Sequence, residues 1–129
     1  MKATTLSVSI AAPQEKVSAF VSNPKNLPQW AGTFFKSIEN IDGEWTVQSP
    51  DGPVVVAFVE DNPFGVLDHT ITLPSGVSLT NPMRVVPNGS GSEVMFTLFQ
   101  TAEMSEQKFS ADAKLVETDL DTLRRILGS

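Results

Sequence analysis

The stretch SEQKFSADAKLVETDLDTLRRILG, residues 105–128, predicts one long amphipathic helix near the end of the chain. Its apolar residues recur at intervals of three and four: Phe109, Ala113, Val116, Leu120, Leu123 and Leu127. Ser105 is a favourable N-cap, and Gly128 follows the last turn as a stop signal. Such a stripe must pack on an apolar surface, and we expect that surface to be the concave face of a sheet.

The residues before this helix predict strands that are separated by turns. Residues 4–10 alternate apolar and polar side chains, which is typical of a half-buried strand. Two short helices should follow, one opening at Pro13 and one at Pro24, the second presenting Leu27 and Trp30. Six further strands are expected at residues 34–41, 44–49, 54–60, 66–73, 77–86 and 93–101. Their connections, such as Asp42-Gly43, are too short for crossover helices, so the strands should form an antiparallel meander.

Length and composition favour a single soluble domain over residues 1–129. The chain has 129 residues, a net charge of −6 and no cysteine. The acidic balance argues against binding to nucleic acid, and the lack of cysteine excludes disulfides and thiolate chemistry. No signal peptide or membrane-spanning run is present, so we expect a cytoplasmic protein without membrane insertion. No pattern indicates an oligomeric state.

Three segments resemble the START-like, or SRPBCC, superfamily. Residues 7–30, SVSIAAPQEKVSAFVSNPKNLPQW, look like its first strand and short helices with their Pro-Trp ending. Residues 84–100, RVVPNGSGSEVMFTLFQ, resemble its last hairpin, and residues 104–127 resemble its closing helix. This superfamily includes the major birch pollen allergen, lipid-transfer domains and the polyketide cyclase/dehydrase group.

The resemblance implies an α+β helix-grip fold. In that fold a seven-stranded curved antiparallel sheet wraps around the long C-terminal helix, with two short helices after the first strand. The architecture tends to enclose a cavity, so binding of a small hydrophobic molecule is the expected function. The resemblance carries no catalytic signature, so it implies the fold more strongly than any chemistry.

His69 is the one histidine and the leading candidate for chemistry. It alternates with Leu67, Ile71 and Leu73 on one strand face, so its imidazole should point into the cavity among apolar side chains. There it would serve as an acid or base near neutral pH, or it would be a buried hydrogen-bonded histidine that orients a ligand. Asp68 should point to the opposite face and therefore should not orient His69.

The strand at residues 77–86 leaves two candidates open. Asn81 lies on its apolar face and is predicted to bind a ligand by hydrogen bonds. Pro82 marks an edge or a bulge and would, if it reverses the alternation, turn Arg84 inward, where it would suit a carboxylate or an enolate. The favoured interpretation of Arg84 is a solvated surface charge.

The remaining predicted site residues are apolar. Trp30 is expected at the cavity rim, and Ile71 and Leu120 should contribute to the wall. The acidic residues of the last helix are interpreted as a solvated face: Asp112, Glu117, Asp119 and Asp121. One histidine with scattered acids matches no metal-site spacing, so we expect neither a metal nor a cofactor.

These observations favour a binding module for a small lipid-like or aromatic molecule. The alternative is an enzyme of the polyketide cyclase or dehydratase type, with His69 as its acid or base. Convergence of two or more polar side chains with His69 would distinguish the enzyme from the binder. A third class, a protein-interaction domain resembling the activator-type co-chaperones of the superfamily, would need an exposed apolar patch that the sequence does not reveal.

Overall fold

The structure is a computed structural model that describes residues 1–129. Its strands are β1 (Ala3–Ile10), β2 (Glu39–Ile41), β3 (Glu44–Ser49), β4 (Gly52–Phe58), β5 (His69–Thr72), β6 (Ser78–Asn81), β7 (Met83–Asn88) and β8 (Gly91–Phe99). Its helices are α1 (Gln14–Val21), the 3-10 helix η1 (Pro24–Asn26), α2 (Leu27–Trp30) and α3 (Glu106–Leu127). None of these helices has the length and apolar character needed to cross a membrane.

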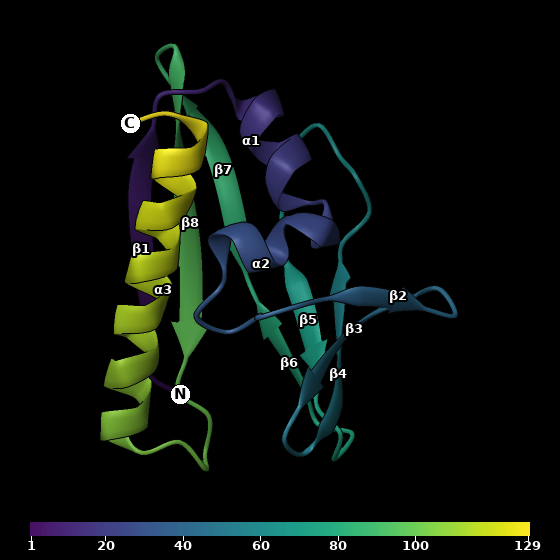
Figure 1. Ribbon diagram of the computed structural model, residues 1–129. Coiled ribbons are helices and arrows are strands. Elements are labelled where there is room, and N and C mark those ends of the chain that lie inside the picture. Colours follow the sequence, from purple (N-terminus) through teal and green to yellow (C-terminus); the bar gives the residue numbers. More distant parts are fainter.

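The strands form two antiparallel sheets (Figure 1). One sheet has three strands in the order β1-β8-β7, and the other has five in the order β2-β3-β4-β5-β6. The prediction of one seven-stranded sheet is therefore wrong. The α+β class is confirmed, with a long C-terminal helix packed on an antiparallel sheet.

Pro82 separates the two sheets. The predicted strand 77–86 is divided at this residue, since β6 pairs with β5 whereas β7 pairs with β8. Proline has no amide hydrogen and cannot donate to a strand ladder. The next amide, that of Met83, donates to the side-chain Oδ1 of Asp68 at 2.9 Å instead of to a carbonyl. The β5–β6 ladder therefore ends at Pro82, and beyond it β7 keeps only an isolated bridge between Arg84 and Val66 on that side.

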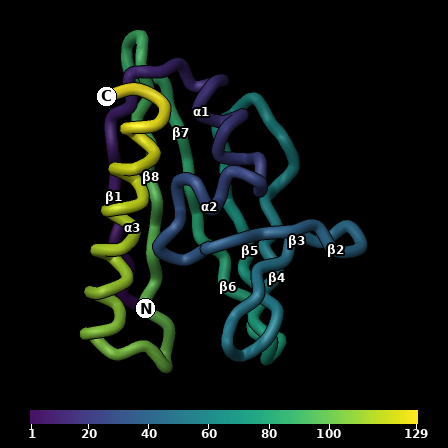
Figure 2. Tube along the Cα trace, in the orientation of Figure 1, coloured from purple at the N-terminus to yellow at the C-terminus, as the bar shows by residue number.

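Helix α3 forms as the sequence predicts. The Ser105 side chain accepts a hydrogen bond from the backbone N–H of Lys108 at 3.1 Å, which caps the first turn. Four residues of the apolar stripe are buried: Phe109, Val116, Leu120 and Leu123. Figure 2 shows α3 running alongside β1, so the first strand and the last helix of the chain pack against each other.

The short helices occupy the space between α3 and the five-stranded sheet. Helix α1 packs on β7, and α2 packs against α3 (Figure 1). Both Leu27 and Trp30 of α2 are buried, as the i, i+3 spacing predicts. At the β2 edge of the five-stranded sheet, Asp42 and Gly43 both have positive φ and form the turn of the predicted β2–β3 hairpin.

Candidate functional site

A cavity of about 510 Å³ lies between α2, α3 and strands from both sheets. Fifteen of its 23 lining residues are hydrophobic, so its wall is mainly apolar. The aromatic part of the wall comes from α2, the segment after it and β8: Trp30, Phe34, Phe35, Phe96 and Phe99. Met1 and the half-exposed Phe34 belong to the mouth, where the cavity meets solvent. Cavities of this size and character are typical of small-molecule sites.

A second hollow, of about 600 Å³, lies between α1 and the chain that follows β4. Only five of its 14 lining residues are hydrophobic. Acidic side chains, Glu15, Glu60 and Asp61, are part of its wall. This hollow lacks the apolar enclosure that holds a ligand, so the first cavity is the candidate site.

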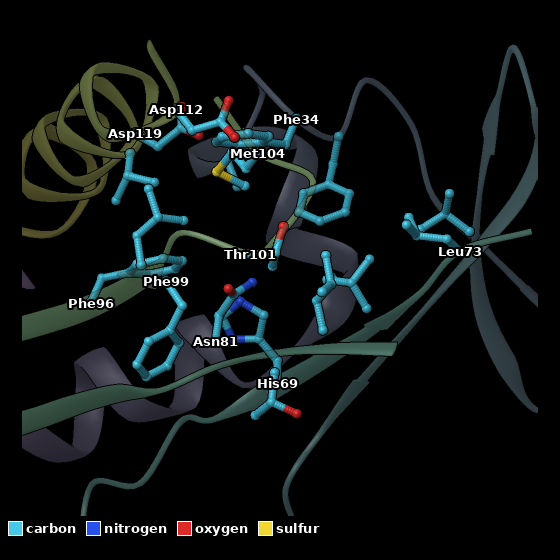
Figure 3. A pocket seen from close by; sticks show the side chains of 18 of the residues that line it. Phe34, His69, Leu73, Asn81, Phe96, Phe99, Thr101, Met104, Asp112 and Asp119 are labelled. Atoms are coloured by element: carbon cyan, nitrogen blue, oxygen red, sulfur yellow. The ribbon is translucent and has the colours of Figure 1, made fainter. Parts of the chain in front are cut away.

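His69 projects into the cavity from β5 (Figure 3). It is only 4% exposed, and its ring lies 4.9 Å from that of Phe58 and 5.7 Å from that of Phe96 between centroids. Nδ1 lies 3.1 Å from the carbonyl oxygen of Leu67. Because a carbonyl only accepts, Nδ1 carries the hydrogen and Nε2 keeps a free lone pair. No protein group bonds to Nε2.

The environment of His69 favours the neutral imidazole. Burial lowers its pKa below the usual value, and this effect exceeds the opposing influence of the Leu67 hydrogen bond and the Asp68 charge. Asp68 itself lies on the other face, as predicted, where its Oδ1 is 2.9 Å from Arg84 Nη1. His69 therefore offers the cavity a hydrogen-bond acceptor rather than a cation.

Asn81 lies beside His69. The two residues are direct cross-strand partners in the β5–β6 pair, and Figure 3 shows their polar groups next to each other. The Asn81 amide has no side-chain hydrogen bond within the protein, so it is free to donate and accept toward a ligand. The polar group next to His69 is thus an amide, which does not titrate.

Two carboxylates of α3 face the same cavity from the opposite wall (Figure 3). Asp112 and Asp119 are 7% and 4% exposed. Asp112 is paired with Lys108 Nζ at 2.6 Å, whereas Asp119 has no ion pair and accepts a hydrogen bond from Thr33 Oγ1 at 2.5 Å. Burial raises the pKa of Asp119, against the lowering effects of Thr33 and of the Lys36 charge.

Trp30 contributes a further polar atom. Its indole Nε1 is buried and has no hydrogen-bond partner, the one such side-chain atom in the structure. Buried donors are normally satisfied, so this nitrogen is an exception, but it has no accessible surface toward the cavity. No group of three or more His, Asp or Glu side chains converges anywhere in the structure in a way that would hold a metal ion.

Comparison with known proteins agrees with this architecture. A family model described as polyketide cyclase / dehydrase and lipid transport matches residues 1–127. The chain belongs to this family. No curated protein matches the chain.

Solved structures show the same fold at low identity. XoxI from Bacillus cereus has a TM-score of 0.75 at 19% identity, over 98% of this chain and 96% of that chain. The Aha1 dimer from Colwellia psychrerythraea has a TM-score of 0.74 at 14% identity, over 98% of this chain and 96% of that chain. DynU16, from the dynemicin biosynthetic locus, has a TM-score of 0.69 at 16% identity, over 98% of this chain but only 47% of that chain. Likeness at such identities shows the fold alone.

In this member of the polyketide cyclase / dehydrase and lipid transport family, four of the predicted site residues line the cavity: Trp30, His69, Ile71 and Asn81. Trp30 is only 3% exposed, so it lies within the wall and not at the predicted rim. Leu120 does not line the cavity, because it is 2% exposed on the part of α3 that packs in the core. Arg84 does not line it either. Alternation continues through Pro82, so Met83 and Val85 point inward and Arg84 pairs with Asp68 outside. The inward alternative for Arg84 is wrong.

The sequence analysis missed the carboxylates on the cavity wall. The prediction of a solvated acidic face is wrong for Asp112 and Asp119, although Glu117 is exposed as expected. Lys108, Asp112, Val116 and Asp119 follow one another at helical spacing and all line the cavity. Such a mixed stripe beside the apolar one is a signal that could have placed the two acids on a covered face.

Proposed function

We propose that the protein binds a small, predominantly apolar molecule in the cavity between α2, α3 and β5. The observation that carries the proposal is the cavity itself, about 510 Å³ with 15 hydrophobic residues among the 23 that line it. A lipid-like or aromatic ligand would remove apolar wall from water, and this burial would supply most of the binding free energy. Membership of a family that includes lipid transport is consistent with this role.

Polar groups within the cavity would orient the ligand. His69 Nε2 accepts a hydrogen bond, and the adjacent Asn81 amide both donates and accepts. A few such groups in an apolar wall are what gives a small-molecule site its selectivity.

A cyclase or dehydratase activity is the second candidate, and the state of His69 supports it. Its neutral ring, with Nδ1–H held by Leu67 and Nε2 free, is arranged as a general base would be. DynU16, a structural relative, comes from a biosynthetic locus. However, the group beside His69 is an amide that moves no proton, so binding is the better supported proposal.

Native mass spectrometry tests the binding proposal. Protein purified from its own host under non-denaturing conditions is expected to carry an added mass of a few hundred daltons in part of the population. The excess should disappear on denaturation, which identifies it as non-covalent. A spectrum with only the bare chain, together with no stabilisation by any compound in a thermal-shift panel of fatty alcohols, flavonoids and aromatic polyketides, would count against the proposal.

A further inference from the structure

The interior of the cavity contains a carboxylate that no cation pairs with. The charged lining residues are Lys108, Asp112 and Asp119. The side chain of Lys108 is 62% exposed and its ammonium is already bound to Asp112. Lys36 influences Asp119 from a distance but forms no ion pair with it, and the chain's amino group at the fully exposed Met1 lies at the mouth. Inside, the carboxylate of Asp119 is therefore left without a cation.

An unpaired buried carboxylate calls for an explanation. Buried charges in proteins are normally paired, because removing a charge from water costs several kcal/mol. Asp119 receives donors only from Thr33, its hydroxyl and its backbone amide, and neither of these groups carries a charge. Its position on the cavity wall means that a ligand group can supply the missing donor.

His69 provides independent evidence of the same kind. Its side chain is buried and points into the cavity, and its Nε2 has no partner in the protein. Since Nδ1 holds the hydrogen, Nε2 is an acceptor as well. Both walls of the cavity therefore present an unfilled acceptor, His69 on β5 and Asp119 on α3, and the neutral Asn81 amide beside His69 adds an uncharged donor (Figure 3).

From this arrangement we propose that the cavity selects apolar molecules with a hydrogen-bond donor as head group, an alcohol or an amine, and discriminates against carboxylates. The inference rests on the proposed function and names its ligand class. A hydroxyl donates to either acceptor, and an ammonium also neutralises Asp119. A carboxylate brings a second negative charge and more acceptors to an interior that has no free cation to receive them. Fatty acids are accordingly poor ligands.

A series with one chain and three head groups tests this proposal. Decan-1-ol, decylamine and decanoic acid are titrated at pH 7, below their aggregation limits, against protein loaded with the neutral probe N-phenyl-1-naphthylamine. The alcohol and the amine should displace the probe at least about tenfold more strongly than the acid, which corresponds to roughly 1.4 kcal/mol. Equal or stronger displacement by the acid overturns the proposal.

The variant Asp119→Asn tests whether Asp119 causes the discrimination between the amine and the acid. The amide keeps an oxygen for Thr33 but removes the charge, so the ratio of amine to acid affinity should fall by about tenfold. Asp121→Asn is the matched control, because Asp121 is on the same helix but pairs with Arg124 and Arg125 on the outside. An unchanged ratio in Asp119→Asn, or an equal fall in Asp121→Asn, overturns the assignment.

The two proposals fail in different ways. If the probe and all three compounds bind equally well, the head-group inference is wrong while the binding function stands. If neither the probe nor any of the compounds binds, the binding function itself is wrong. The wild-type series needs no variant, so it decides the matter even if Asp119→Asn does not fold.

Discussion

At the scale of single residues, the tautomer of His69 determines what the cavity offers. The carbonyl of Leu67 fixes the hydrogen on Nδ1, and burial keeps the ring neutral. The sequence predicted the inward, neutral imidazole because strand alternation and apolar neighbours are local properties. It could not predict which nitrogen is free, since that depends on a carbonyl whose direction only the folded chain defines.

His69→Gln separates binding from catalysis. For a binder, the affinity for an apolar alcohol should change by less than about tenfold, because the glutamine amide can replace one hydrogen bond worth roughly 1 kcal/mol. For a cyclase or dehydratase, turnover should fall by about 10²–10⁴-fold. Calorimetric titration of wild type and variant measures the first, and a product assay the second. A loss of affinity far above tenfold without any turnover would contradict both accounts of His69.

The same variant has a defined effect on acid stability. Because the folded pKa of His69 is lowered, the unfolded chain takes up a proton that the folded chain refuses. This contribution to stability is present above about pH 6.5, the unperturbed value, and is lost as pH falls below it. In urea unfolding, the free energy of unfolding of His69→Gln should therefore fall less steeply than that of wild type as the pH drops below this value. Asp119 acts in the opposite sense, with a raised pKa, but it is common to both proteins and cancels in the comparison.

At the scale of elements, the local sequence pattern predicted helix α3, whereas the division of the strands into two sheets depends on pairing between separate segments. The stripe of α3 lies within one segment, so its helix and its buried face follow from spacing alone. The division at Pro82 coincides with Asp68 taking the Met83 amide, a contact between residues that are 15 positions apart along the chain. A proline in a strand indicates a possible break, but the partners of each half are set by the rest of the fold.

The acids of α3 illustrate a related limit. Asp112 and Asp119 look like ordinary surface residues in the sequence, yet α2 and the segment after it cover them. Thr33, which bonds to Asp119, lies 86 residues away along the chain. The helix pattern shows that Asp112 and Asp119 share a face with Val116, but only the packing of α2 shows that this face is covered.

Leu120→Ala tests the packing of α3. Leu120 is 2% exposed, and truncating a buried leucine should cost about 2–5 kcal/mol of unfolding free energy in urea. Leu115→Ala is the control on the same helix, because Leu115 is 38% exposed and should cost less than about 1 kcal/mol. Equal small losses in both variants would mean that α3 does not pack on the sheet as described.

At the scale of the whole molecule, two sheets and α3 enclose a space that no single element defines. The three-stranded sheet carries α3, and the five-stranded sheet carries His69 and Asn81 toward it (Figure 1). Helix α2 fills part of the gap, and the remainder is the cavity. The resemblance to the START-like superfamily implied such a space, but it did not point to the carboxylates Asp112 and Asp119 on the cavity wall.

Uptake of the neutral probe N-phenyl-1-naphthylamine tests the cavity most directly. Wild-type protein should give a saturable fluorescence increase with one site per chain. Ile71→Trp, which places an indole in the cavity, should weaken probe binding by about tenfold or more. Thr70→Trp should not, because Thr70 is the strand neighbour of Ile71 and does not line the cavity. No saturable increase in wild type, or binding by Ile71→Trp as strong as by Thr70→Trp, would contradict a ligand-binding cavity at this place.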